Sequence, residues 1–477
     1  MLSIGNAFSR LLRRTPTNVQ EPLRLNPENR NFPTPELRIV PRAAHTLSRK
    51  HISSGALRVL YRLHESGYAA YLVGGAVRDL LLGGHPKDFD IATDATPEQV
   101  RQLFRNCRLI GRRFRLAHVV FGREIVEVAT LRGQDGEGER QVHDDGRILR
   151  DNIWGSIEED ALRRDFRVNA LYYDISDYSV RDYVGGLEDL EQRELHLIGE
   201  PEQRYREDPV RMLRAARLSA KLGFEIADAS AAPIAELAPL LADVAPARLF
   251  DEALKLFMTG HGLASFHQLE RYGLLRWLLP ALAAALTRDR AGTLRRMTER
   301  ALINTDARVR EDKPVTPAFT FAVLLWSEVQ PEAARLLESG VEASAAWHRA
   351  GQMAIAEQAQ RVAIPRRFGV VMEEIWALQP RFAVRSARGR VQRLLAHPRF
   401  RAAYDFLLLR VEQEPALAEL AAWWTAAQEQ PGTALPAHAA SSKPAESDAG
   451  EGAAPTATRR RRRGGQRKRK SGGGSDA

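Results

Sequence analysis

Two aspartates separated by one residue, Asp88 and Asp90, are the first candidates for chemistry in this sequence of 477 residues. On a β-strand alternate side chains share a face, so both carboxylates would lie together while Phe89 points into the core. Adjacent carboxylates repel each other, and a divalent cation removes the repulsion by binding both. The pair alone is a weak signal, because a solvated strand end has the same pattern.

A glycine pair precedes these aspartates. Residues 72–79 (LVGGAVRD) predict a strand, a turn at Gly74 and Gly75, and a helix. Exposed backbone N–H groups at such a turn can hold phosphate, and Arg78, one helical turn later, adds guanidinium donors for the same phosphates. The pattern is neither the Walker motif nor the dinucleotide fingerprint.

A third carboxylate, Glu127, lies in the otherwise apolar strand pattern of residues 125–129 (IVEVA). A buried charge is costly unless it is paired, so we expect Glu127 to bind or support the metal. An edge position that faces water is the alternative.

Residues 163–170 (RRDFRVNA) surround one acid with three arginines. Arg164 and Asp165 suit contacts with a triphosphate and a ribose hydroxyl. A mutually neutralised helix face is the alternative.

The segment 207–214 (EDPVRMLR) places Asp208, Arg211 and Arg214 three residues apart, on one side of a helix. Such a row of acceptors and donors can read the edge of a base. Otherwise Asp208 is only a helix cap and the arginines are solvated.

Residues 101–123 contain seven arginines and no acid, interleaved with Phe104, Phe114 and His118. This composition predicts contact with RNA or a triphosphate. The predicted RNA-binding residues are Arg105, Arg108, Arg112, Arg113 and Arg115.

The elements predicted around these residues form a small N-terminal domain of strands and helices, here called the head. Short strands are predicted at 71–73, 89–92, 119–121 and 125–130, with a hairpin over 170–184. The Gly-rich polar stretch 133–150 predicts a mobile loop, and Ser156 with Glu159 a helix-opening capping box. Beyond residue 200 nearly everything predicts helix, including one framed by Asp208, Pro209 and Gly223.

The net charge of +10 is concentrated at the two ends of the chain: residues 1–43 carry +4, residues 431–477 carry +6, and the rest is neutral. Charge therefore predicts polyanion-binding tails on a neutral core.

The single cysteine, Cys107, excludes an intramolecular disulfide and indicates a reducing cytoplasm. Apolar residues at helical spacing near the N-terminus are compatible with partial membrane association, although a frayed terminus is favoured.

Together, the motifs at 73–79, 88–90, 163–170 and 207–214 resemble, in order, the signature of class II template-independent nucleotidyltransferases. That family comprises bacterial poly(A) polymerases and CCA-adding tRNA nucleotidyltransferases. Residues 109–119 (LIGRRFRLAHV) resemble the element that marks poly(A) polymerases. The resemblance covers roughly residues 40–425.

The resemblance implies an α+β protein: a polymerase-β-like head, then all-helical neck, body and RNA-binding regions, with a disordered basic tail. It implies that Asp88 and Asp90 bind two Mg²⁺ ions and that Asp165 belongs to the active site. The positions Asp208, Arg211 and Arg214 would select the incoming base. The expected division is 1–43 extended arm, 44–200 catalytic head, 201–260 neck for nucleotide recognition, 261–430 body and RNA-binding region, and 431–477 tail.

The expected reaction is transfer of AMP from ATP to an RNA 3′-hydroxyl, with release of pyrophosphate. We expect a cytoplasmic monomer that binds ATP and RNA 3′ ends, acts with RNA-decay machinery and promotes mRNA decay.

A CCA-adding enzyme that uses CTP and ATP is the nearest alternative. An inactive RNA-binding scaffold would lack an acid of the Asp88–Asp90 pair, and the long helical part argues against a small-molecule nucleotidyltransferase.

Overall fold

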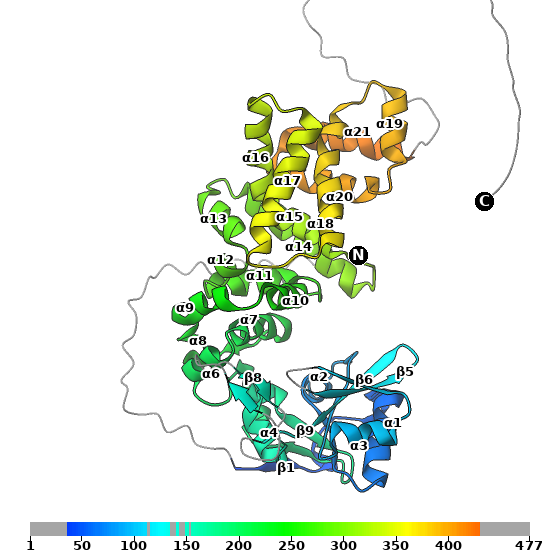
Figure 1. Cartoon of the computed structure of the whole chain (residues 1–477), viewed down its shortest axis with the longest axis vertical. Coiled ribbons are helices and arrows are strands. Elements are labelled where there is room, and N and C mark those ends of the chain that lie inside the picture. The colour runs from blue at the N-terminus through cyan, green and yellow to red at the C-terminus, as the bar shows by residue number, and fades with distance from the viewer. Residues whose placement is uncertain (1–35, 112–114, 134–139, 143–147, 152–153, 430–477) are drawn as a thin grey trace, which may run out of the picture.

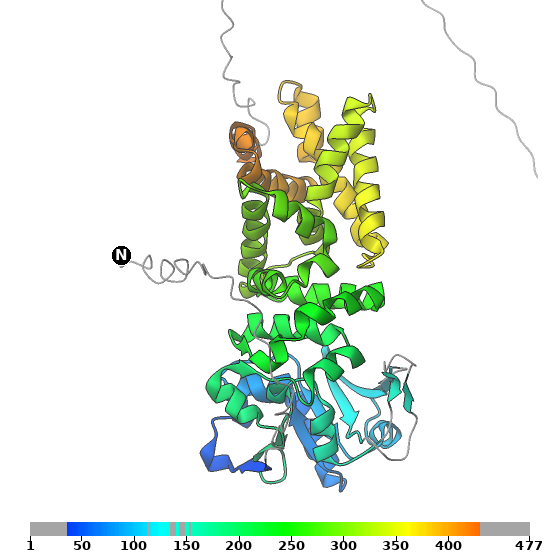
Figure 2. The same ribbon diagram turned by 90° about the vertical axis from the view of Figure 1, so that its left-hand side faces the viewer.

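An elongated molecule carries its β-sheet at one end and a stack of helices above it (Figure 1), as the side view also shows (Figure 2). The computed structural model describes residues 36–111, 115–133, 140–142, 148–151 and 154–429. The expected α+β class, with a mixed sheet followed by helices, is confirmed. The predictions for most of the N-terminal arm and for the tail lie outside the described residues.

The head is built on an eight-stranded sheet with the order β1-β10-β9-β2-β3-β6-β5-β4. The β3–β6 pair is parallel, and the other neighbours are antiparallel. The strands are β1 (Arg38–Val40), β2 (Ala70–Val73), β3 (Asp90–Thr93), β4 (Cys107–Ile110), β5 (Leu116–Phe121), β6 (Glu124–Thr130), β9 (Leu171–Asp174) and β10 (Val180–Asp182). The predicted strands and the hairpin are confirmed, whereas β1 and β4 were not predicted.

Two small sheets complete the strands. An antiparallel ribbon joins β7 (Arg140–Val142) to β8 (Ile148–Asp151), and a parallel pair joins β11 (Glu194–Leu195) to β12 (Glu225–Ile226). The prediction of an irregular loop over 133–150 is therefore wrong at β7 and β8. Backbone hydrogen bonds make this ribbon, and strands of three and four residues (RQV and ILRD) are too short to show an apolar alternation that would reveal them.

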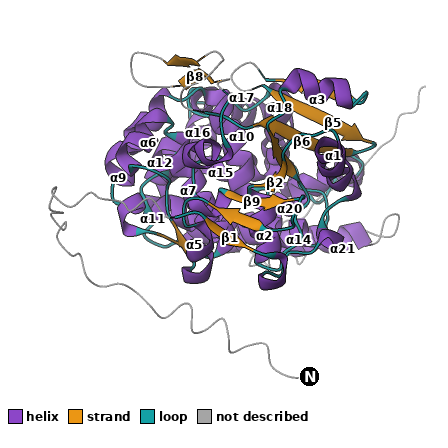
Figure 3. Ribbon diagram, turned by 90° about the horizontal axis from the view of Figure 1, so that it is seen from below, coloured by secondary structure: helices purple, strands orange, loops and turns teal. Residues whose placement is uncertain are grey.

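Helices cover both faces of the sheet. The head helices are α1 (Ser54–Glu65), α2 (Gly75–Leu81), α3 (Pro97–Leu103), α4 (Ile157–Arg163) and α5 (Gly186–Gln192). Buried side chains of α1 and α3 pack with those of β3, β5 and β6 in one apolar cluster, and Figure 3 shows both helices beside β5 and β6. On the opposite face Ala161 of α4 packs with Tyr71 and Tyr172. The Ser156–Glu159 capping box at the start of α4 is confirmed.

The rest of the described chain is helical, with large aromatic residues such as Trp326 and Trp376 fully buried in its main core. Its helices are α6 (Pro201–Glu207), α7 (Val210–Leu222), α8 (Asp228–Ala231), α9 (Ile234–Leu237), α10 (Pro246–Phe257), α11 (Gly262–Arg271), α12 (Leu275–Leu278), α13 (Pro280–Arg288), α14 (Thr293–Arg310), α15 (Pro317–Leu324), α16 (Trp326–Glu338), α17 (Ala343–Ala359), α18 (Arg366–Leu378), α19 (Arg388–Leu395), α20 (Phe400–Gln413) and α21 (Ala418–Glu429). A search of the described helices finds none long and apolar enough to cross a bilayer.

Candidate active site

The turn between β2 and α2 is the centre of the candidate site. Gly74 has φ 71° and ψ −139°, a combination that is strongly disfavoured for residues with a side chain. A Cβ placed on Gly74 would lie 3.7 Å from an Arg164 guanidinium nitrogen and 3.9 Å from Asp90 Oδ2. The turn therefore brings the glycine motif, one aspartate and one arginine together, as the sequence motifs require.

The Asp88–Asp90 pair has the predicted alternation. Phe89 is buried in the core, whereas Asp88 and Asp90 are exposed, and β3 begins at Asp90. Asp90 is exposed, but the surrounding protein removes part of the hydration of its carboxylate. The partial loss of water, the negative charge of Glu127 and that of Asp88 raise the pKa of Asp90 to about 6, although Arg164 acts in the opposite direction.

Glu127 lies beside Asp90, because the parallel register of β3 and β6 pairs these two residues. Its carboxylate is about half exposed, and His118 on β5 approaches it with Nε2 at 3.3 Å from Oε1. Glu127 therefore faces water next to the aspartate, as the second of the two alternatives has it, and its role toward a metal stays a prediction. This position makes Glu127 a third carboxylate at the same edge.

The carboxylates fit a divalent cation. The repulsion that raises the pKa of Asp90 is the repulsion that a bound cation would relieve. Within the described part of the chain, no three His, Cys, Asp or Glu side chains form a complete metal-binding group. A pair of carboxylates that shares its cation with substrate oxygens needs no such group.

Arg164 is held in place by side chains that the sequence motifs did not include. Asp160 Oδ2 accepts hydrogen bonds from Arg164 Nε at 3.1 Å and Nη2 at 2.9 Å, and the Tyr172 hydroxyl accepts one at 2.8 Å. Burial alone would lower the pKa of Arg164, but Tyr172 and Asp160 outweigh it and raise the pKa above its ordinary value. A permanent positive charge is thus fixed beside Gly74. The spacing of Asp160, four residues before Arg164, is the signal that could have revealed it.

Asp165 connects the head to the neck. Arg214 on α7 pairs with Asp165 Oδ2 at 2.6 Å, while the Phe166 amide and Asn169 donate to Oδ1. Burial would raise the pKa of Asp165, but Arg214 and these hydrogen bonds lower it. The carboxylate is therefore ionised and fixed against a neck helix.

Arg78 is buried rather than directed into solvent. Its Nε donates to Asp79 Oδ1 at 2.8 Å, and a further guanidinium nitrogen donates to Asn169 Oδ1. Asp79 in turn accepts from Lys221 on α7 at 2.8 Å. In this arrangement Arg78 braces α2 against Asn169 and, through Asp79, against α7.

The segment after α6 arranges Asp208, Arg211 and Arg214 differently from the predicted row. Helix α7 begins at Val210, so Asp208 lies before it. The guanidinium of Arg248 on α10 donates two hydrogen bonds to the Asp208 carboxylate, at 2.8 and 2.6 Å. Arg211 donates to Glu207 at 3.0 Å. Each member therefore has its own partner. Arg248, 40 residues from Asp208, has no signal in the sequence.

The basic stretch 101–123 lies around the edge strand β4. Arg105, Arg108 and Arg115 are exposed, and Arg115 forms an ion pair with Glu98 at 2.9 Å. Phe104 is a core residue, so the expectation that it interleaves the arginines on the surface is wrong. Arg112, Arg113 and Phe114 lie outside the described residues.

Comparison with known proteins shows to which family the chain belongs. Three family models match: "Poly A polymerase head domain" over residues 70–196, "Probable RNA and SrmB-binding site of polymerase A" over 223–286, and "Polymerase A arginine-rich C-terminus" over 339–469. A Poly(A) polymerase I from Salmonella typhi is 51% identical over 398 residues, 82% of this chain and 85% of the relative. A CCA-adding enzyme from Bacillus pumilus is 40% identical over 201 residues, 42% of this chain and 49% of the relative.

Among solved structures, the CCA-adding enzyme of Bacillus stearothermophilus in complex with CTP is similar, with a TM-score of 0.52 and 28% identity. The match covers 78% of this chain and 82% of that enzyme.

A polymerase head with paired aspartates at a Gly-Gly turn defines a template-independent nucleotidyltransferase. This class contains poly(A) polymerases and CCA-adding enzymes, and the match to Poly(A) polymerase I is both longer and more identical than the match to the CCA-adding enzyme. The chain belongs to the poly(A) polymerase I family. The expectations of a nucleotidyltransferase and of poly(A) addition are thereby confirmed. The CCA-adding alternative is less supported, because that relative matches less than half of the chain.

Proposed function

We propose that this protein transfers AMP from ATP to RNA 3′-hydroxyl groups through the site around Gly74, Asp90 and Arg164. The observation that carries the proposal is that Asp90 and Arg164, from separate elements, both lie next to Gly74 at the turn between β2 and α2. Substrate phosphate groups fit beside a glycine that offers no side chain, next to a guanidinium that remains charged at all physiological pH values. Asp88 and Asp90 face the same space from the start of β3.

We assign Mg²⁺ to the exposed carboxylates of Asp88 and Asp90, with Glu127 beside them. Magnesium takes oxygen ligands and commonly combines one or two carboxylates with substrate phosphates and water, which suits this partial set. When bound, it would supply a lowered pKa for the attacking hydroxyl and charge stabilisation for the leaving pyrophosphate. Glu127 opposes ionisation of Asp90 by charge repulsion, so Asp90 would become fully ionised as the cation binds.

The remaining residues orient the reactants. Arg164 would neutralise charge on the triphosphate. Gly75, which has no side chain, would let the backbone of the turn approach the triphosphate. Arg78 would stabilise the turn through its hydrogen bonds to Asp79 and Asn169. Asp165 fixes α7 through Arg214, so that the neck is held at a defined angle to the catalytic strands. Asp208, oriented by Arg248, and Arg211 are placed to read the adenine edge without a template.

The same proposal assigns regions to tasks. Residues 44–200 carry the chemistry, 201–260 nucleotide recognition, and 261–430 RNA contact. Exposed Arg105, Arg108 and Arg115 would contact RNA from the head, and the basic tail would add salt-dependent affinity. We further propose that the enzyme is a cytoplasmic monomer that marks RNA for decay.

Replacing the paired aspartates tests the mechanism. In the Asp88→Asn/Asp90→Asn variant, AMP incorporation should fall by at least about a thousandfold, because the cation loses both carboxylates. Affinity for RNA should change less than about threefold, since RNA is held elsewhere. Radiolabelled ATP with an oligonucleotide primer measures the first quantity and fluorescence anisotropy the second.

The control is Asp251→Asn, which removes one exposed carboxylate on α10 far along the chain from the turn. It should leave incorporation unchanged. Substantial incorporation by the double aspartate variant would contradict the assignment.

Nucleotide choice tests the branch of the family. Given ATP or CTP and either a generic RNA or a tRNA that lacks its terminal nucleotides, the protein should extend both RNAs with long runs of AMP. Efficient CMP incorporation on the shortened tRNA, with arrest after two additions from CTP alone and after three when ATP is also present, would instead establish a CCA-adding activity.

A further inference from the structure

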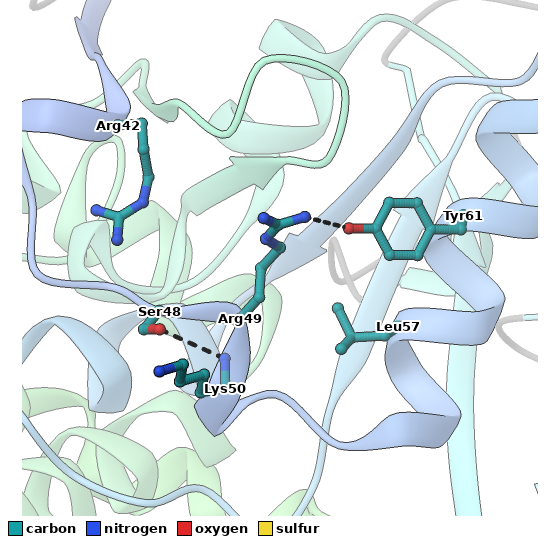
Figure 4. A pocket seen from close by; sticks show the side chains of 6 residues that line it. All are labelled: Arg42, Ser48, Arg49, Lys50, Leu57 and Tyr61. Carbon is teal, nitrogen blue, oxygen red and sulfur yellow. Dashed lines mark hydrogen bonds between the residues drawn. The ribbon is translucent and has the colours of Figure 1, made fainter.

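A second charged hollow lies in the head, apart from the candidate active site. It has a volume of about 450 Å³ and is formed by the 3₁₀ segments Arg42–Ala44 and Arg49–His51 together with α1. Figure 4 shows its side chains, with Arg49 between Arg42 and Tyr61. The lining residues are Arg42, Ser48, Arg49, Lys50, Leu57 and Tyr61.

This hollow is at the far end of the central strands from Gly74. Arg49 donates to the hydroxyl of Tyr178, which lies in the turn between β9 and β10. The β2–β9 register pairs Val73 with Tyr172 and Tyr71 with Asp174, so this turn lies beyond the end of β2 opposite to the glycine turn. The hollow is therefore separate from the Asp88–Asp90 pair.

The hollow holds three cations without counter-charges. Arg42, Arg49 and Lys50 are all exposed, and in the described chain none of them has an ion pair with a carboxylate. Arg42 donates to the backbone oxygen of His45 at 3.1 Å, which leaves its charge in place. By contrast, Arg164 and Arg214 in the active site each face an aspartate. Three uncompensated charges around one hollow attract an anion.

Arg49 is fixed in position by neutral groups. Its guanidinium donates to the Tyr61 hydroxyl at 2.6 Å and to the Tyr178 hydroxyl at 3.2 Å, and its carbon lies 4.3 Å from the centre of the Tyr178 ring. These contacts orient the guanidinium and do not neutralise it. Ser48 caps the short helical turn that carries Arg49 and Lys50. The charge is thus oriented before any ligand arrives, which lowers the entropic cost of binding.

We propose that this hollow binds backbone phosphates of the RNA strand upstream of its 3′ end. Guanidinium and ammonium groups are the usual partners of phosphate oxygens, and Tyr61 with Leu57 offers an apolar surface for a ribose or base. A lipid surface fits less well, because Leu57 is the one aliphatic side chain in the lining. The inference rests on the proposed function for RNA as the substrate. It adds a second RNA contact outside the active site, so that the protein would cover a longer stretch of the RNA strand.

The test compares two double variants of the full-length protein. Arg42→Gln/Lys50→Gln removes two charges from the hollow and retains the packed Arg49. Arg58→Gln/Arg62→Gln removes two exposed charges from α1 that do not line the hollow and have no ion pair among the described residues. Binding of oligoadenylates of about 6 and about 30 nucleotides is measured by anisotropy over a series of salt concentrations.

For the long oligonucleotide, the hollow variant should bind at least about threefold more weakly at about 0.1 M salt. Its log–log salt dependence should be shallower by about 1.4, or ~0.7 per lost phosphate contact. The α1 control should change affinity less than about twofold, and the two variants should behave alike on the short oligonucleotide.

Equal weakening by the two variants, or no weakening by the hollow variant, would overturn the proposal. So would a loss confined to binding of phosphatidylserine vesicles, which would make the hollow a lipid site. AMP incorporation by the unaltered protein is measured in parallel, so failure of this proposal is distinguished from failure of the proposed function.

Discussion

Gly74 shows how much of the active site depends on one backbone conformation. With φ 71° and ψ −139°, an alanine here would be strained even though its Cβ would have ordinary contacts of 3.7 Å or more. Gly74→Ala should therefore cost about 1–3 kcal/mol of folding stability through strain and not through a clash. Because relaxing the strain moves the turn relative to Asp90 and Arg164, kcat should fall at least about tenfold. Thermal unfolding and AMP incorporation measure the two effects.

Gly67 supplies the matched control. It also has a positive φ, 85°, and a Cβ placed on it would have no other atom within 4 Å, but it lies at the end of α1 away from the glycine turn. Gly67→Ala should lose stability to a similar extent and retain its activity. If Gly74→Ala were as active as Gly67→Ala, the conformation of Gly74 would have no catalytic role.

Residue types along the chain identified the catalytic motifs but not their partners. Asp88, Asp90 and Arg164 were recognisable, since their spacing reflects strand and helix periodicity. The contact of Arg78 with Asn169 and that of Asp208 with Arg248 join residues 91 and 40 positions apart. A single sequence carries no record of such pairs, because each depends on how separate elements pack. Arg78 and Asp208 consequently looked like free binding groups when they have protein partners.

At the scale of elements, the inner strands of the main sheet were predictable, whereas its two edge strands and the separate β7–β8 ribbon were not. Strands β2, β3 and β6 are largely apolar runs, as expected for a covered sheet. The β7–β8 ribbon consists of two short strands of mixed polarity, RQV and ILRD, in a Gly-rich stretch, and β1 lies within a Pro-rich stretch. Both owe their pairing to partner strands rather than to their own composition.

The α16–α17 pair gives an element-level prediction of pH dependence. Partial burial of Glu328 on α16 and the nearby charge of Glu357 on α17 raise the pKa of Glu328 to about 7. In the unfolded chain the group has an ordinary pKa of about 4.3. Below that value both states are protonated and nothing is lost. Between about 4.3 and 7 the unfolded chain ionises first, so stability falls as the pH rises.

Glu328→Gln removes this penalty. The variant should be about 1–2 kcal/mol more stable than the parent at pH 8, after allowance for solvent screening, and equally stable near pH 4. Thermal unfolding at the two pH values measures the difference. Glu338→Gln, at the exposed end of the same helix, is the control and should show no such pH-dependent gain. A gain that is identical at both pH values would contradict the role of ionisation.

At the scale of the whole molecule, the head and the helical part are joined by charged contacts. Asp165 pairs with Arg214, and Asp79 pairs with Lys221, so two points on the head hold the same helix, α7. Asp208 extends the connection to α10 through Arg248. The sheet of the head, the segment before α7 and helix α10 are therefore linked by ion pairs. The sequence predicted a head with a sheet followed by helices, and packing decided how the two parts connect.

The distribution of charge assigns a separate task to residues 431–477. The core from residue 44 to 430 is formally neutral, whereas the final segment carries +6, including nine basic residues at 459–470. Basic side chains bind polyanions by releasing counterions, so their contribution to RNA affinity falls steeply as the salt concentration rises.

A chain that ends at residue 430 should bind RNA at least about tenfold more weakly at ~0.05 M salt and show a shallower salt dependence, by several units of slope. At saturating RNA its kcat should match that of the full chain, because all the active-site contacts described above lie within residues 36–429. Replacing only the nine basic residues with Gln should reproduce the effect of the deletion, which separates charge from length. Loss of turnover at saturating RNA would show instead that the segment takes part in the chemical step or in product release.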